Sequence, residues 1–376
     1  MEEHRDSFDG KLPPDLAAQV GYTEVKYPDQ FNTRVSGFDF AKCGNTVDFD
    51  QMLSEASLAT GLQATMFGKA VVELKRMIEA KLKGHLTEEE SKKQEMPDVD
   101  WKPTPCTIFM SYTSNLMTAG TREIIRYLVQ HKMVDCIVST AGGIEEDFIK
   151  CLIPTTIGSF DLDGEDLFRQ RINRNGNILL SLKHYALFED WVVPIVDKML
   201  EEQDAGYHWT PSRFIRRLGK EINNEESVYY WAYKNNIPVL CPALTDGGIG
   251  DLLFFHAYKH DGRTLSIDIV EDVRKIMNIV VKSKSTAFFL LGGGVSKHHI
   301  LNANAMRHGG DYAVFVNTAQ EFDGCDSGAR PDEGKSWGKI HVNAKPVKVF
   351  SEASLVLPLL VSQTFFKYQS EFDKIL

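Results

Sequence analysis

The sequence lacks the features that mark membrane and secreted proteins. No apolar run is long enough to span a bilayer, and the first ten residues, MEEHRDSFDG, contain no apolar stretch of the kind found in signal peptides. The six cysteines are scattered, none of them in a CxxC pair, and several stand in apolar runs such as DCIVST. We therefore expect a cytoplasmic protein with no membrane association, whose cysteines are reduced and packed as small hydrophobic side chains.

The sequence also lacks an excess of positive charge. Lysine and arginine total 42 against 52 aspartate and glutamate residues, which gives a formal net charge of −10. Non-specific binding of nucleic acid needs a cationic surface, so we expect no nucleic-acid partner. The remaining composition, with 43% hydrophobic and 25% charged residues in 376, is typical of a globular protein with a sizeable core.

Short apolar runs alternate with helical patterns from about residue 106 onward. The runs are CTIFMSY, DCIVST, IPVLCPAL, TLSIDIV, TAFFLLGGG, DYAVFVN and KPVKVF. Continuous apolar strands that alternate with helices are typical of a parallel sheet buried on both faces. We therefore predict an α/β fold, with a Rossmann-like parallel sheet, helices on both faces and an N-terminal helical extension.

The N-terminal part has a different pattern. Residues 50–82 favour a helix, because Phe67, Val71, Leu74 and Ile78 recur at helical spacing. Residues 84–105 are charged, contain proline and show no periodicity, which indicates a linker or loop. We therefore predict an N-terminal helical extension and linker over 1–100 and a catalytic domain over 101–376. Residues 156–225 favour irregular structure, followed by a helix near PSRFIRRLGKEI.

Small, acidic and glycine residues follow five of the apolar runs, in TSNLMTAG, TAGGIEE, TDGGIGD, GGGVSKHH and NTAQEFDG. Turns favour such residues in any case. Ligands of open α/β sheets bind beyond the carboxyl ends of the strands, however, and five such turns indicate a site there. The glycines of LGGGVSKHHI allow a phosphate to approach a helix start, although Lys297 breaks the GxGxxG pattern.

Two histidines stand just after these glycines. His298 and His299 have neither a histidine at i+4 nor a nearby cysteine, so we expect no metal site. Close to a helix N-terminus, His298 tends to be neutral and is then able to accept a proton or to hold an amine. A purely structural histidine fits the pattern equally well. Asn302 stands one turn further on and is expected to hold the ring.

Carboxylates and a tryptophan also gather in these turns. Acidic residues follow three of the runs, and the segment DEGKSWGKI (332–340) places Trp337 between two lysines. Carboxylates around an aromatic ring bind extended organic cations. A lysine in such a cleft is useful as a nucleophile, because a desolvated amine forms imines.

Several blocks of the sequence resemble the deoxyhypusine synthase family. They are TAGGIEED, GKEINNEESVYYWA, PALTDGGIGD, LGGGVSKHHI, NTAQEFDGCDSGARPDE and SWGKI. The resemblance implies an enzyme that uses NAD and transfers the aminobutyl group of spermidine to one lysine of the translation initiation factor 5A precursor. It also implies an enzyme-lysine imine, a homotetramer with sites shared between two chains, and an N-terminal segment able to cover the entrance.

The resemblance assigns roles to individual residues. The lysine after WG, Lys339, is the catalytic nucleophile with His298 beside it, whereas Lys335 is interpreted as a solvated neighbour. The implied polyamine contacts are Glu145, Glu146, Asp251, His298, Gly324, Asp326, Glu333 and Trp337. The implied cofactor contacts are Ser114, Asn115, Thr118, Thr140, Ala141, Gly142, Glu146, Asp246, Gly293, Thr318, Ala319 and Glu352.

The sequence departs from the family pattern at a few positions. Phe315 stands where the family has tyrosine, Cys325 replaces a serine, and Ser351-Glu352 replaces an Ala-Asp pair. Two alternatives stay open. One is a homospermidine synthase, which gives the same group to putrescine, and the other is a catalytically impaired paralogue that activates the synthase as a subunit.

Overall fold

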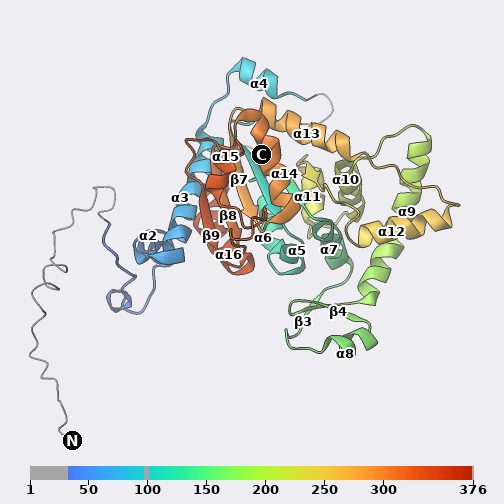
Figure 1. Cartoon of the computed structure of the whole chain (residues 1–376), viewed down its shortest axis with the longest axis horizontal. Coiled ribbons are helices and arrows are strands. Elements are labelled where there is room, and N and C mark those ends of the chain that lie inside the picture. The colour runs from blue at the N-terminus through green and yellow to red at the C-terminus, as the bar shows by residue number, and fades with distance from the viewer. Residues whose placement is uncertain (1–32, 97–100, 375–376) are drawn as a thin grey trace, which may run out of the picture.

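A six-stranded parallel sheet forms the centre of the protein (Figure 1). The structure is a computed structural model that describes residues 33–96 and 101–374. The strands run in the order β6-β2-β1-β7-β8-β9, and every neighbouring pair is parallel. They are β1 (Thr107–Tyr112), β2 (Cys136–Ser139), β6 (Val239–Leu240), β7 (Thr286–Leu291), β8 (Tyr312–Asn317) and β9 (Val347–Phe350).

The central strands read as continuous apolar runs because both faces of the sheet are buried. All residues of β1 and β7 are buried, and alternate side chains enter different cores. Phe109 and Phe288 pack edge-on in one core, with ring centroids 6.3 Å apart, whereas Met110 enters the other. Without a solvated face, the polar alternation of a surface strand disappears.

Helices cover both faces, which confirms the predicted fold class. The core on the first face takes side chains from α3 (Leu62–Lys83), α6 (Arg122–Gln130), α7 (Ala141–Leu152), α10 (Pro211–Ile222), α11 (Val228–Lys234) and α16 (Ala353–Gln363). The core on the second face takes side chains from α13 (Ile269–Lys282) and α14 (Gly294–Asn304). None of the described helices is long and apolar enough to cross a bilayer.

The strand order reverses between β1 and β7. From β1 the chain proceeds to β2 and β6, then returns through α12 (Gly248–Lys259) and α13 to β7, and continues outward to β8 and β9. Loops at the carboxyl ends of β1 and β7 therefore diverge to opposite sides of the sheet. Open α/β sheets bind ligands in the crevice that forms at such a point.

The N-terminal helix packs on the sheet. Its break at Gly61, where φ is +95°, separates α3 from the short helices η3 (Gln51–Ala56) and α2 (Ser57–Thr60). Leu74 and Ile78 of α3 are fully buried in the main core, and α3 lies against β8 and β9. A domain division near residue 100 stays a prediction.

Three local expectations from the sequence were wrong. The charged segment 84–105 contains α4 (Glu88–Gln94), because Thr87 and Glu90 form a capping box and Gln94 exchanges two hydrogen bonds with Thr104, of 2.9 and 3.1 Å. TLSIDIV forms only an isolated bridge at Ile267 before α13 begins. The third concerns residues 156–225.

Residues 156–204 are regular, although the sequence favoured irregular structure. They form a small antiparallel sheet of β3 (Thr156–Ile157), β4 (Ile172–Asn175) and β5 (Ile178–Ser181), with α8 (Gly164–Arg169) and the long α9 (Leu182–Asp204). The small sheet and α8 project from the body (Figure 1). Pro194 lies inside α9 and masked its pattern, but Phe188, Val192 and Ile195 still bury one face of the helix. The helix predicted near PSRFIRRLGKEI is α10.

Candidate active site

Lys339 and His298 meet beyond the carboxyl edge of the sheet. Nζ of Lys339 lies 3.1 Å from Nε2 of His298 and 5.4 Å from the centre of the Trp337 ring. The turn that follows α15 (Pro331–Ser336) carries Lys339, with φ of +66° at Gly338. Ile340, the next residue, is fully buried and holds this turn against the second core. The lysine, the histidine and the tryptophan of the predicted site are therefore brought together.

The other lysine of the turn has a different role from the one expected. Lys335 is half-buried, and its ammonium donates hydrogen bonds of 3.0 Å to the carbonyls of Val342 and Ala344. The interpretation as a solvated neighbour was wrong. Lys335 instead joins α15 to the turn that precedes β9, and of the two lysines only Lys339 contacts His298.

The position of His298 also differs from the sequence-based interpretation. Because α14 begins at Gly294, His298 lies in its second turn and not in its first. Asn302, which was expected to hold the ring, is exposed, and no hydrogen bond joins the two side chains in the described part of the chain. The ring nitrogen that faces the site is oriented by Lys339.

A buried amine holds the acidic loop that follows β8. Lys297 is only 1% exposed, and its Nζ donates to the backbone carbonyl of Asp326 and lies 3.6 Å from Oδ2 of the same residue. Oδ2 of Asp326 is buried and has no hydrogen-bond partner. Glu333 and Trp337 are exposed, the latter to 66%. Gly324 has φ of +73°, which suits a glycine in this loop.

Two further carboxylates lie on α7, on the first face of the sheet. Oε2 of Glu145 accepts a hydrogen bond of 2.9 Å from the backbone N–H of Ile249, and the N–H of Gly248 also bonds this carboxylate. Glu145 thus caps α12, whose own cap residue, Gly247, has no side chain to do so. Burial raises the pKa of Glu145 despite these hydrogen bonds, and Asp251 adds to the rise by repulsion.

Glu146 has an unused oxygen. The residue is 9% exposed, and its Oε2 is buried without a hydrogen-bond partner. Burial raises the pKa of Glu146 to about 7, and repulsion from Glu145 adds to the effect, whereas a hydrogen bond from Thr118 opposes it. A buried carboxylate oxygen without a donor is costly unless a ligand supplies one. Glu146 is thus suited to receive a cation.

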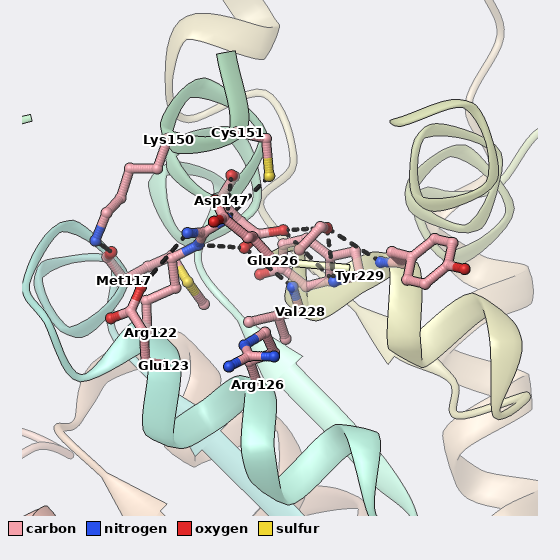
Figure 2. A network of polar contacts seen from close by, with 12 residues as sticks. Met117, Arg122, Glu123, Arg126, Asp147, Lys150, Cys151, Glu226, Val228 and Tyr229 are labelled. Carbon is pink, nitrogen blue, oxygen red and sulfur yellow. Dashed lines mark hydrogen bonds and ion pairs between the residues drawn. The ribbon is translucent and has the colours of Figure 1, made fainter. Parts of the chain in front are cut away.

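A buried polar network fixes α7 and hence both glutamates (Figure 2). Asp147 is fully buried and accepts hydrogen bonds from Nε of Arg122 on α6, at 2.8 Å, and from Oγ of Ser227, at 2.5 Å, at the start of α11. Lys150 donates to three carbonyls at the end of α5 (Asn115–Thr118). One helix is therefore tied to three others, which sets where Glu145 and Glu146 point.

A cavity of about 280 Å³ lies at the reversal point between β1 and β7. Its walls come from the loops that follow β1, β7, β8 and β9: Thr113, Asn115, Leu116, Gly292, Gly293, Val316, Asn317, Thr318, Ala319, Ser327, Ser351, Glu352 and Ala353. Five of the predicted cofactor contacts, Asn115, Gly293, Thr318, Ala319 and Glu352, line it. Open α/β sheets bind their ligands at such a place, so the cavity is a candidate ligand site.

The other predicted cofactor contacts stand outside the cavity wall. Six of them belong to α5 and α7 or to the N-caps of these helices: Ser114, Thr118, Thr140, Ala141, Gly142 and Glu146. The N–H of Ser114 donates a hydrogen bond of 3.1 Å to Oγ1 of Thr140. A Cβ on Gly142 would lie 2.9 Å from Cβ of Ser114, so only glycine allows this approach. Asp246 is exposed, just before α12.

The predicted polyamine contacts fall into two groups. Glu145 and Glu146 lie on α7, which packs on the first face of the sheet, and Asp251 lies close enough to Glu145 to repel it. His298 lies on α14, which packs on the second face, together with Lys339. Within the described residues, no hydrogen bond or ion pair joins the two groups. Each group also holds a buried carboxylate oxygen that lacks a hydrogen-bond partner, one on Glu146 and one on Asp326.

Sequence reasoning missed the residues that support the site. Lys297, Lys348 and Asp147 are buried charges that hold loops or helices in place. Ser327 lies in the block NTAQEFDGCDSGARPDE but was assigned no role, and its Oγ accepts a hydrogen bond of 2.8 Å from the N–H of Gly294. Lys348 and Asp147 stand inside apolar patterns, in KPVKVF and EEDFIKCL. A charged residue at a position that the pattern assigns to the core was the available signal.

Comparisons with known proteins identify the family of this chain. The family model described as deoxyhypusine synthase matches residues 51–364. A relative from Dictyostelium discoideum named "Probable deoxyhypusine synthase" is 55% identical over 356 residues, which are 94% of this chain and 92% of the relative. Homospermidine synthase 2 of Senecio vernalis is 49% identical over 350 residues, 91% of this chain and 92% of that protein.

A solved structure is also similar. The crystal structure of a protein named as a deoxyhypusine synthase of Entamoeba histolytica has a TM-score of 0.59 and is 32% identical, covering 88% of this chain and 97% of that one. With the matched region spanning the sheet, the lysine turn and both groups of carboxylates, this chain belongs to the deoxyhypusine synthase family.

Proposed function

We propose that this protein transfers the aminobutyl group of spermidine to one lysine of the translation initiation factor 5A precursor, with NAD as cofactor. The contact between Lys339 and His298 carries the proposal. A lysine ammonium has only donors, so the 3.1 Å contact requires one of the two nitrogens to have given up a proton. His298 is therefore placed to accept the proton that Lys339 must lose before its amine attacks an imine carbon.

The residues of this chain perform distinct tasks in that reaction. The amine of Lys339 attacks the imine carbon of the oxidised polyamine and 1,3-diaminopropane leaves, so that the four-carbon fragment is held as an imine on Nζ. His298 takes the proton that the attacking amine loses. The ring of Trp337, beside Nζ, provides an aromatic face for the cationic end of the fragment. The acceptor lysine then displaces Lys339 from the same carbon.

The cavity between β1 and β7 is the proposed place of the dinucleotide. Gly292 and Gly293 leave no Cβ in its wall, and a Cβ on Gly293 would lie 2.5 Å from Oγ of Ser327. The backbone N–H groups at the start of α14 would hold the phosphates, and the carboxylate of Glu352 would bind ribose hydroxyls. When bound there, NAD would supply hydride transfer: it would oxidise the carbon beside the secondary amine of spermidine, and the reduced cofactor would return the hydride to the final imine.

A complete site requires two chains. The two groups of polyamine contacts lie on helices that cover opposite faces of the sheet, so we propose that the glutamates of one chain face the lysine of a second copy. Phe254, Phe255 and Tyr258 of α12 are 55–76% exposed beside Asp251, which suits an interface that covers them. A tetramer of two such dimers extends this arrangement. The N-terminal segment proposed to cover the entrance lies outside the described residues.

The protein lysine as acceptor of the aminobutyl group is also part of the proposal. Homospermidine synthase remains the alternative, because the relative that carries this name is almost as similar as the deoxyhypusine synthases. An impaired paralogue is disfavoured by the intact group of Lys339, His298 and Trp337. An acceptor that is a translation factor also implies a cytoplasmic enzyme.

One experiment tests the proposal. Purified protein is incubated with NAD, spermidine and the factor 5A precursor, or with putrescine in place of the precursor. We expect the intact mass of the precursor to rise by one aminobutyl group, with little homospermidine formed. Homospermidine as the main product would assign the alternative activity, and absence of both products would support the impaired paralogue.

A further inference from the structure

A group of two histidines and one aspartate lies outside the active site, between α9 and α12. Nε2 of His256 lies 2.9 Å and Nε2 of His260 lies 2.8 Å from the same oxygen, Oδ1 of Asp197. The three ligand atoms lie within 4.8 Å of one another. We propose that these residues bind one divalent metal ion of the Zn²⁺ type, independently of the function proposed above.

The helices impose this geometry. His256 lies in the last turn of α12 and His260, four residues on, is the C-cap of that helix, and their rings stack with centroids 4.3 Å apart. Asp197 comes from α9, which packs beside α12, and a second contact of 3.1 Å, between Lys259 and Glu189, joins the same two helices. Two packed helices and the C-cap of one of them therefore bring all three side chains together before any ion binds.

The donor set selects the kind of ion. Two imidazole nitrogens and one carboxylate oxygen suit zinc and similar borderline metals, which bind such atoms at about 2.0–2.2 Å. At tetrahedral angles these ligands stand about 3.3 Å apart, so the present contacts need to open by only about half an ångström. When the ion replaces the hydrogen bonds to Asp197, the ring proton of each histidine lies on Nδ1.

The site is accessible yet anchored. His256 is 1% exposed, whereas the side chains of His260 and Asp197 are 32% and 41% exposed. An ion is thus able to enter from solvent, and three protein ligands leave a fourth position for water. The sequence signal is HAYKH (256–260), a spacing that binds zinc when both histidines lie on one helix face. The expectation of no metal was based on His298 and His299 alone.

Metal uptake by the untagged full chain tests the proposal. The chain is treated with a chelator, dialysed against Zn²⁺ and measured for bound metal, and Co²⁺ is used as a coloured probe. We expect one ion per chain, the visible absorption typical of four-coordinate Co²⁺, and a higher unfolding temperature with Zn²⁺, because the ion binds only the folded state.

Three variants make the test specific. His260→Gln and Asp197→Ala should bind Zn²⁺ at least tenfold more weakly and lose the thermal shift, as follows from the loss of one ligand. His85→Gln, an exposed histidine between α3 and α4, should bind as the unaltered chain does. Circular dichroism verifies that each variant is folded. Equal uptake by all four proteins, or none by the unaltered chain, would overturn the proposal.

Discussion

Lys297 and Lys348 hold one loop with two buried amines. Lys297 on α14 donates to the carbonyl of Asp326, and Lys348 on β9 donates to the carbonyls of Ala319 and Gly328, at 3.0 and 2.8 Å. Burial lowers the pKa of both lysines, and the charge of Lys297 lowers that of Lys348 further. The loop between β8 and α15, which carries Asp326, is thus fixed from the core side.

We predict that Lys348→Met weakens NAD binding, although Lys348 does not line the cavity proposed for the cofactor. Two carbonyls lose their donor, which costs about 1–3 kcal/mol of loop stability, and Ala319 lines the cavity. Isothermal titration with NAD measures the effect. Lys345→Met, at an exposed position nearby, is the matched control, and equal affinities for the two variants would contradict the prediction.

Substitutions of the two lysines on either side of Trp337 should have different effects, one on catalysis and the other on stability. Lys339→Arg should abolish aminobutyl transfer, because a guanidinium does not form an imine. Lys335→Met should keep transfer activity but lower the free energy of unfolding by about 1–2 kcal/mol, because the carbonyls of Val342 and Ala344 lose their donor. Transfer assays and urea unfolding of both variants check this, and a fully active Lys339→Arg would identify a different nucleophile.

His298→Ala should slow the reaction by about 10²–10⁴, the usual contribution of a general base. Release of 1,3-diaminopropane at saturating NAD measures the rate across pH. Asn302→Ala provides the control, because Asn302 is exposed and unbonded to the ring, and it should behave nearly as the unaltered protein. Equal losses of activity in both variants would show that the contact between His298 and Lys339 is not the cause of the slower reaction.

Glu146 should make stability depend on pH. Its pKa is raised to about 7 in the folded chain, against about 4.3 in an unfolded chain. Between these values the folded state binds more protons, so the free energy of unfolding falls as pH rises and levels off above about 7. Glu146→Gln should remove up to about 4 kcal/mol of this fall. Urea unfolding from pH 4.5 to 8 measures it, and identical pH profiles would refute the assignment.

Two inactive variants should restore activity when mixed, if the site spans two chains. Lys339→Ala and Asp251→Ala remove one residue from each group, so a mixed dimer keeps one intact site. Random reassembly should recover about a quarter of the normal activity. Light scattering gives the assembly state. An active monomer would exclude a shared site.

The sequence allowed the fold class and the lysine turn to be predicted, because both depend on local patterns. Buried strands read as apolar runs, and the block SWGKI identifies Lys339 by resemblance. Contacts between distant segments were not predictable in this way. Glu145 bonds Ile249, which is 104 positions away, and Lys335 bonds carbonyls whose position depends on a turn. Such partners are set by packing, which a single sequence does not display.

Glu145 has two roles that a comparison of active and inactive relatives should distinguish. Because its carboxylate caps α12, selection for folding alone is sufficient to retain it after catalysis is lost. Glu146 has an oxygen with no structural partner, and its burial as an acid is unfavourable in the free chain. In relatives that have lost catalysis, Glu146 should therefore be replaced before Glu145. The residue at position 146, and not the one at 145, thus indicates whether the proposed polyamine site is functional.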